Sequence, residues 1–176
     1  MPFETKVAQP FRAAIAGLKP CATTVLVLSL ACTGCGPSID VAAALRLESD
    51  STGWVDVGPV GSTNKLVPAV EFTVKNATDR TLAPVEVNAV FRRVGEASEW
   101  SNGMVTAAGS SGLAPAAATD RLVIKGGAGY TGTDAQGELL RNSKFVDATV
   151  DVFARYGSRQ WARVGEYQIA RQLIER

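Results

Sequence analysis

A strict alternation of apolar and polar side chains between residues 146 and 154 constrains the fold more than any other feature of the sequence. The apolar set is Val146, Ala148, Val150, Val152 and Ala154, and Asp147, Thr149 and Asp151 lie between its members. Successive side chains of an extended strand point to opposite faces, so this segment predicts a strand with one buried and one solvated face. Such a strand belongs to an antiparallel sheet that is covered on one side.

The same alternation recurs in shorter segments that turn residues separate. Residues 70–75 and 85–91 alternate clearly around the turn formers of 76–80, so we expect a hairpin or two neighbouring strands. Further strands are predicted at 41–48, 54–57, 119–125 and 161–170, with a helix as the alternative for 41–48 because of its alanines. One short helix is expected at 134–142, with Asp134 as its N-cap.

Short strands at intervals of roughly 10 to 20 residues predict an all-β fold. The expected architecture is an immunoglobulin-like antiparallel β-sandwich over residues 41–176, with at most one short helix and a signal segment before it. The length of 176 residues suits one domain and a leader.

The residues before 36 have a different character. Scattered positive charge is followed by an apolar run of 15 residues from Cys21 to Cys35, which is the pattern of a secretory signal. A membrane-spanning helix needs about 20 apolar residues, so export is favoured and a retained membrane anchor is the alternative. Cys32 and Cys35 also have C-x-x-C spacing, but a redox motif of that kind belongs beside a βαβ unit.

The segment 31–36, Ala-Cys-Thr-Gly-Cys-Gly, resembles the bacterial lipoprotein box, in which small residues precede a cysteine that is acylated. The resemblance implies a signal segment 1–34 and a lipidated cysteine with its tether at 35–40. Cys35 is the expected lipidation site and Cys32 the alternative, because Cys32 stands where the box usually has Leu; a cleaved signal without lipid is a further alternative. Gly36 in place of Asp implies the outer membrane, facing the periplasm. Each buried methylene of the acyl chains strengthens anchoring by about 0.8 kcal/mol.

Residues 72–91, Phe-Thr-Val-Lys-Asn-Ala-Thr-Asp-Arg-Thr-Leu-Ala-Pro-Val-Glu-Val-Asn-Ala-Val-Phe, are similar to the strand, Asn-containing turn and strand of FxLYD-like envelope β-sandwiches. The aromatic-aspartate ending of that signature is replaced by Arg-Arg-Val-Gly after Phe91. The resemblance implies an extracytoplasmic sandwich and supplies no catalytic residue.

The chemistry available to the chain is narrow, because it contains no histidine. The commonest general base near neutral pH and the commonest zinc ligand are therefore missing, and the three cysteines lie in the leader, so we expect no metal site and no cofactor. Three of the 18 basic and one of the 17 acidic side chains precede Cys35, which leaves the remainder nearly neutral. Nucleic acid is thus not an expected partner. We expect no enzyme activity; the alternatives are a histidine-free hydrolase and a carrier of a small apolar ligand between the two sheets.

Two further patterns are interpreted structurally. Residues 127–132 match G-x-G-x-x-G, but that fingerprint works in a parallel βαβ unit, and too little chain follows to complete one. We interpret it as a glycine-rich loop. Asp147 and Asp151 are expected about 13 Å apart on one strand face, too far for a paired acid and base, so they are predicted to be solvated.

The candidate binding surface is a predicted hairpin that groups arginines with aromatic rings. Its residues are Arg155, Tyr156, Arg159, Trp161 and Arg163, and Trp100 from a separate loop is a further candidate. Arginine and aromatic side chains are favoured at recognition sites, although such a turn can also simply pack its rings on the core. We expect a non-catalytic binding or assembly module, tethered to a membrane by lipid, that contacts an envelope protein or a cell-wall component.

Overall fold

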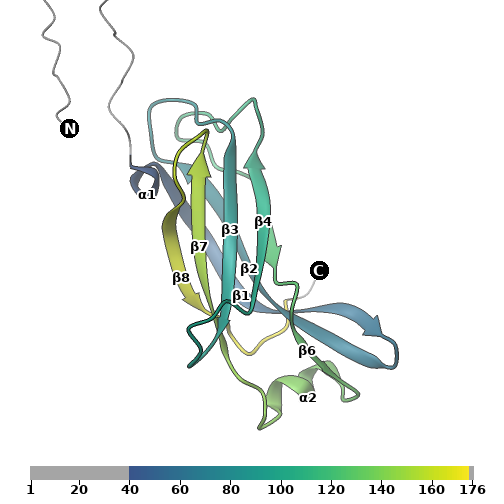
Figure 1. The fold of residues 1–176 in the computed structure, drawn as a ribbon. Helices are drawn as coiled ribbons and strands as arrows, with labels where there is room; N and C mark the ends of the chain where they lie inside the picture. The colour runs from purple at the N-terminus through teal and green to yellow at the C-terminus, as the bar shows by residue number, and fades with distance from the viewer. Residues whose placement is uncertain (1–39, 175–176) are drawn as a thin grey trace, which may run out of the picture. The chain divides into compact units, whose positions relative to one another are not determined.

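The computed structural model describes residues 40–174. The predicted signal segment 1–34, Cys35, Cys32 and all of the tether except residue 40 lie outside the described residues. The described part consists of two antiparallel sheets with a shared apolar core between them (Figure 1). The predicted all-β sandwich is confirmed.

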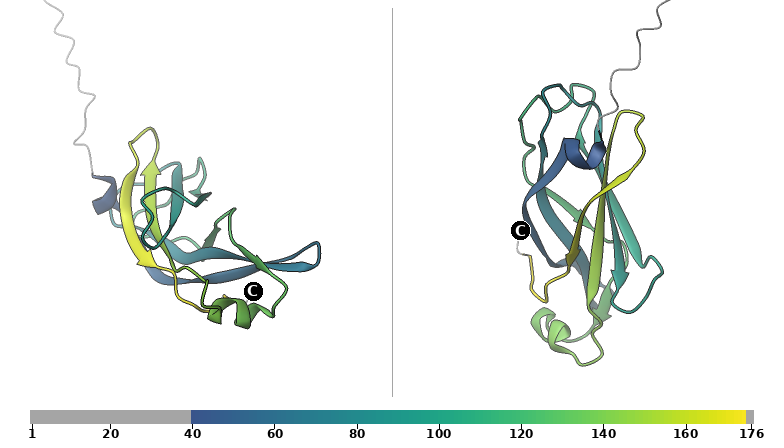
Figure 2. Two further views of the ribbon diagram at one scale, coloured as in Figure 1. Left: turned by 60° about the horizontal axis from the view of Figure 1, so that its bottom comes forward. Right: turned by 90° about the vertical axis from the view of Figure 1, so that its left-hand side faces the viewer.

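The first sheet contains β1 (Leu45–Val60), β2 (Thr63–Asn76), β5 (Leu122–Lys125) and β6 (Tyr130–Gly132), with β2 paired to the other three. The second sheet has the order β4-β3-β7-β8, formed by β3 (Val85–Arg93), β4 (Ser101–Ala108), β7 (Ala148–Tyr156) and β8 (Ala162–Gln168). Two short helices complete the fold, α1 (Val41–Ala44) and α2 (Gln136–Arg141). Helix α2 lies at the end of the sandwich opposite the β7–β8 turn (Figure 2). These two ends are called the α2 end and the turn end below.

The structure has one helix more than the single short helix expected. The segment 41–48 divides into α1 and the beginning of β1, because the Asp40 carboxylate accepts a hydrogen bond from the Ala42 N–H at 3.2 Å and caps the first turn. Helix α2 falls inside the predicted range 134–142. Its N-cap is Ala135 rather than Asp134, whose carbonyl oxygen instead accepts from the Asn64 side chain at 2.9 Å.

Strand β7 follows the predicted alternation closely. Ala148, Val150, Val152 and Ala154 are all fully buried, as one face of a half-buried strand requires. Val146 is the exception, because β7 begins only at Ala148 and the Val146 side chain is 40% exposed. The following turn and return strand are confirmed as the antiparallel pair of β7 and β8.

The prediction that residues 70–75 and 85–91 pair with each other is wrong. Strand β2 pairs with β1 and β5, whereas β3 pairs with β4 and β7, so residues 77–84 cross from one sheet to the other. Phe72 and Val87 are both fully buried in the same core cluster, which the two sheets share. Alternation identifies the buried face of a strand but not the sheet to which the strand belongs.

Both long edges of the sandwich are bridged. At one edge, the Thr52 hydroxyl of β1 donates to Gln168 O at 2.8 Å and accepts from the Ala170 N–H at 3.1 Å. At the other edge, β4 and β5 approach so closely that a Cβ on Gly103 would lie 2.5 Å from Lys125 O. The β1–β2 hairpin projects past the second sheet (Figure 2). The two ends and the outer faces of the sheets are therefore the surfaces that a partner can reach.

Candidate functional site

The structure separates the predicted binding residues into two groups. Tyr156 of the hairpin is in register with Val85, at the start of β3. Trp100 donates its backbone N–H to Phe91 O at 2.9 Å, near the other end of the same strand. At about 3.3 Å per residue, these positions are roughly 20 Å apart, so Trp100 does not join the hairpin.

The hairpin arginines are largely neutralised by neighbouring carboxylates. Arg155 Nε lies 2.6 Å from Glu86 Oε2, and its guanidinium stacks 4.6 Å from the centroid of the Trp161 ring. Arg163 contacts both Asp151 at 3.0 Å and Glu166 at 2.7 Å. The hydrogen bond to Asp151 raises the pKa of Arg163, so this side chain stays charged and paired. A surface balanced in this way does not attract an anionic lipid or glycan strongly.

The alternative interpretation of the hairpin, in which its aromatic rings pack on the core, holds in part. Tyr156 packs against the core, and the Arg159 guanidinium lies 6.0 Å from the centroid of its ring. Trp161 is half-buried beneath Arg155. The turn end therefore presents a packed hairpin with one cation, Arg159, that has no carboxylate partner among the described residues.

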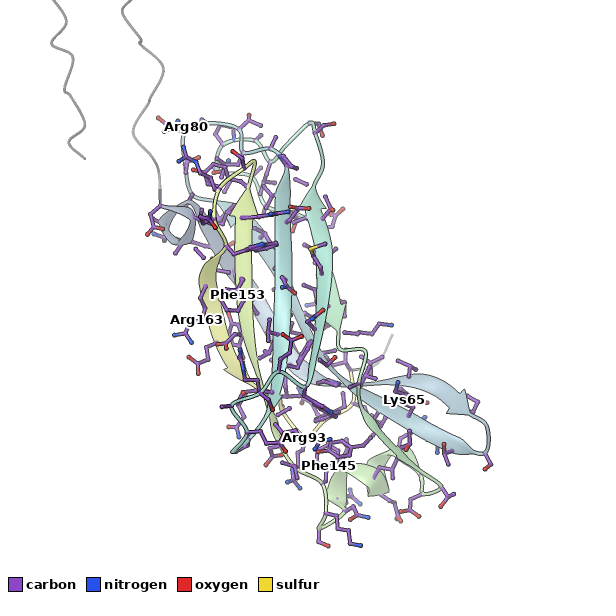
Figure 3. All side chains as sticks on the ribbon, viewed as in Figure 1. Lys65, Arg80, Arg93, Phe145, Phe153 and Arg163 are labelled. Carbon is purple, nitrogen blue, oxygen red and sulfur yellow. The ribbon has the colours of Figure 1, made fainter. Side chains whose placement is uncertain are left out.

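The β7–β8 hairpin belongs to the second sheet, and its outward side chains are part of the outer face of that sheet. We define this outer face by its outward side chains: Glu86, Asn88, Val90, Arg92, Asn102, Met104, Thr106, Thr149, Asp151, Phe153, Arg155, Arg163, Glu166 and Gln168. Strand register places Met104, Asn88, Phe153 and Arg163 side by side across all four strands. Phe153 and Arg163 are labelled on this face in Figure 3.

The centre of the outer face is apolar. Met104 is 63% exposed, more than the exposed Val57, Val94 and Val146. Phe153 is half-buried, and Val90, although it points outward, is only 8% exposed. The Asn88 Oδ1 atom between Met104 and Phe153 is buried and has no hydrogen-bond partner among the described residues. A partner that covered this centre would remove apolar surface from water.

Paired charges surround that centre. The prediction that Asp147 and Asp151 are solvated is wrong, because both form ion pairs. Asp151 is not a solvated face residue: its side chain is 17% exposed and is paired with Arg92 and Arg163. Asp147 lies before β7, where it binds Arg171 with Nε to Oδ1 at 2.6 Å and raises the pKa of that guanidinium. On the outer face, three arginines thus face the three carboxylates of Glu86, Asp151 and Glu166.

The α2 end holds an aromatic cluster that the sequence did not reveal. Trp54, Trp100, Tyr130 and Phe145 come from four distant segments, and no local pattern connects them. Trp54 is fully buried, with ring centroids 4.6 Å from Phe145, 5.7 Å from Tyr130 and 6.3 Å from Trp100. The Arg93 guanidinium lies 4.8 Å from the Trp100 centroid, and Arg93 and Phe145 are labelled at this end in Figure 3.

A pocket opens beside this aromatic cluster. Its volume is about 220 Å³, and it is lined by Tyr130, Thr131, Leu139, Asn142, Lys144 and Phe145. Phe145 and Tyr130, whose centroids are 4.6 Å apart, form the aromatic side, and the polar lining comes from Thr131 of β6 and from Asn142 and Lys144 after α2. None of these lining residues was predicted as a site residue from the sequence; Trp100 was, and it lies in the adjoining aromatic cluster.

The glycine motif at 127–132 contacts β4 of the second sheet and β2 of the first. The Ser101 hydroxyl accepts hydrogen bonds from the backbone N–H groups of Gly127 at 2.6 Å and Ala128 at 3.1 Å. A Cβ on Gly129 would overlap the carbonyl oxygen of Leu66. The motif therefore connects β5 to β6, which both pair antiparallel with β2, and it does not lie at the start of a helix after a parallel strand.

Within the part of the chain that the structure describes, no group of three or more His, Cys, Asp or Glu side chains is placed to hold a metal ion. No helix formed by residues 40–174 has both the length and the apolar character needed to cross a membrane.

Comparisons with known proteins give structural similarity only. No family model matches the chain, and no curated protein sequence matches it. Among solved structures, the structural genomics target SoR45 aligns over 74% of this chain and 89% of its own, with 13% identity and a TM-score of 0.43. The protein AT1g01470 from Arabidopsis thaliana aligns over 71% of this chain and 74% of its own, with 14% identity and a TM-score of 0.38.

Proposed function

We propose that the chain is a non-catalytic binding module of the cell envelope, exported and lipidated at Cys35, with Cys32 as the alternative, and exposed on the periplasmic side of the outer membrane. The outer face of the second sheet is its recognition surface, and the partner is an envelope protein. The lipoprotein-like leader supports the proposed location at the outer membrane. The composition of the outer face supports binding to a protein.

The observation that carries this proposal is the apolar centre of Met104, Phe153 and Val90 inside a rim of paired charges. Protein interfaces have this anatomy, with an apolar core and a polar rim. Because the arginines and carboxylates of the rim balance one another, a protein surface of mixed charge fits better than an anionic polymer. Met104 is 63% exposed, so covering its side chain completely is worth about 1–2 kcal/mol.

Site-specific photo-cross-linking in intact cells tests the recognition surface. A photoreactive amino acid at position 104 is expected to give a discrete protein adduct. The matched control is position 75 on the outer face of the first sheet, where the Lys75 side chain is 41% exposed; no adduct is expected there. Equal labelling from both positions, or none from position 104, refutes the proposal.

A second variant separates loss of the partner from loss of the fold. Met104→Lys places a charge at the apolar centre without entering the core, because the side chain is already 63% exposed. It is expected to remove the adduct formed by a photoreactive residue at position 102, while the thermal unfolding midpoint stays the same. An adduct that persists in Met104→Lys contradicts the role of the apolar centre.

The anchor is tested by labelling cells with a palmitate analogue. Cys35→Ser is expected to lose the label, whereas Cys32→Ser keeps it. Loss only in Cys32→Ser moves the lipid to the alternative site, and label retained in both single variants refutes anchoring through either cysteine.

A further inference from the structure

We propose that the pocket at the α2 end binds a small organic anion with an apolar body, such as an arylalkyl carboxylate or a short-chain carboxylate. This site is distinct from the outer face of the second sheet, and it is not the space between the two sheets. The proposal therefore does not depend on the protein partner proposed above.

The apolar wall of the pocket is preorganised. Tyr130 and Phe145 line it, and the Phe145 ring also packs edge-on against fully buried Trp54 at 4.6 Å between centroids. The Arg171 guanidinium lies 5.2 Å from the Phe145 centroid and donates to Phe145 O at 3.2 Å. Leu139 of α2 completes the wall and is 7% exposed. A rigid aromatic wall binds a ring or a short chain without first having to be ordered.

The polar lining consists of groups that can donate hydrogen bonds. Lys144 makes no ion pair with any residue from 40 to 174, in contrast to Arg171, which Asp147 neutralises. The Asn142 Oδ1 atom accepts from the Lys144 backbone N–H at 2.9 Å, which leaves the amide N–H groups of Asn142 as donors. Thr131 adds a hydroxyl. An ammonium, an amide and a hydroxyl suit a carboxylate, which only accepts hydrogen bonds when ionised.

The size of the pocket limits the ligand. Its volume of about 220 Å³ is smaller than the roughly 300–1,000 Å³ of sites for drug-sized molecules, so it accommodates one ring or a chain of a few carbons. The Tyr130 hydroxyl does not contribute a donor, because it donates to Val146 O at 3.1 Å. The carboxylate is therefore expected to lie at the rim near Lys144, with the apolar body against Phe145.

Hydrocinnamate is a suitable probe, and hydrocinnamyl alcohol is its neutral counterpart. A molecule of about eleven heavy atoms at ordinary ligand efficiency has a dissociation constant in the millimolar range or somewhat below it. Titration of the isotope-labelled full chain, followed by amide chemical shifts, is expected to perturb Thr131, Asn142 and Lys144. The alcohol is expected to bind about fivefold to tenfold more weakly, since it loses the charge-assisted contact.

Matched variants identify the cation. Lys144→Gln is expected to weaken hydrocinnamate binding to the level of the alcohol, and Arg141→Gln, which removes the same charge outside this pocket, is expected to leave both affinities unchanged. Leu139→Trp is expected to fill the pocket and abolish both.

Three results overturn the proposal. They are equal affinities for acid and alcohol, equal effects of Lys144→Gln and Arg141→Gln, and shift changes confined to residues outside the pocket. A longer acid, decanoate, tests the size limit, because binding tighter than that of hydrocinnamate contradicts a ring-sized site.

Discussion

Replacing Asn76 by alanine is expected to lower the free energy of unfolding by about 2–6 kcal/mol, because its side chain joins two of the segments that cross between the sheets, residues 77–84 and 109–121. Asn76 is fully buried. Its Nδ2 atom lies 2.8 Å from Arg80 O, 2.9 Å from Leu113 O and 3.0 Å from Ala114 O. Its Oδ1 atom accepts from the backbone N–H and the hydroxyl of Thr78 at 2.9 and 2.7 Å.

The magnitude follows from the number of hydrogen bonds lost and from what remains for their partners. A buried hydrogen bond contributes about 0.5–1.5 kcal/mol net, and the alanine variant loses the equivalent of about four, because two amide N–H groups share three carbonyl acceptors and Oδ1 accepts from two donors. The carbonyls do not become orphans, because Leu113 O still accepts from the Leu82 N–H at 3.1 Å and Ala114 O from the Ala117 N–H at 3.2 Å. The cost is therefore a sum of modest terms rather than a full desolvation penalty.

Asn76→Asp is the sharper test, because it keeps the shape and reverses the polarity of one atom. The introduced carboxylate oxygen faces three carbonyl oxygens without a donor, so this variant is expected to lose about 4 kcal/mol or more at neutral pH. Burial and the carbonyl dipoles raise the pKa of the introduced carboxyl in the folded state above its unfolded value. The stability of this variant relative to the native chain is thus highest below the unfolded pKa and falls as pH rises through the folded one.

Urea unfolding, followed by the fluorescence of Trp54 and Trp100, measures these differences. Thr78→Val is the matched control: it removes only the hydroxyl and is expected to cost about 1 kcal/mol. The reasoning is refuted if Asn76→Ala costs less than Thr78→Val, or if the stability of Asn76→Asp relative to the native chain increases with pH.

Two more substitutions test close packing. Gly129→Ala is expected to lower the free energy of unfolding by about 2–3 kcal/mol, because the new Cβ overlaps Leu66 O. Gly127→Ala makes no such contact and is expected to be nearly neutral. Equal losses of stability in the two variants contradict a packing role for the motif. Ile174→Asp is expected to cost about 1–2 kcal/mol, because it puts a charge on the apolar patch of the first sheet's outer face, and Val94→Asp, at a site 48% exposed, is expected to change little. An unfolding midpoint that is the same in these two aspartate variants contradicts the packing of Ile174 on that patch.

The half-buried strands were the most predictable part of the fold. In β7, one side chain in two is buried because a strand projects alternate residues to opposite faces, and this rule needs no knowledge of the partners. The turn at Gly157 was also predictable, because it interrupts two alternating segments. Among the described residues of that turn, Gly157 is the one with a positive φ. Local chemistry therefore predicts strands and turns together.

Strand β2 shows where such reasoning fails. Its residues from Leu66 to Phe72 are buried on both faces. The core covers one face, and the chain near Ile174 packs on the apolar patch of Val55, Val67 and Ala69 on the other. The segment that covers the second face lies about a hundred residues further along the chain, so no window of sequence around β2 contains it.

By itself, the sequence determined an all-β sandwich and a chemistry without histidine, because alternation and composition are local properties of the chain. The lipoprotein-like leader stays a prediction from the residues before 36, which lie outside the described residues. Only the tertiary structure decided that β2 and β3 lie in opposite sheets, that the hairpin arginines meet carboxylates on neighbouring strands, and that Trp100 belongs to the cluster around Trp54. These features depend on contacts between segments far apart in sequence, and such contacts form only when the two sheets pack around their common core.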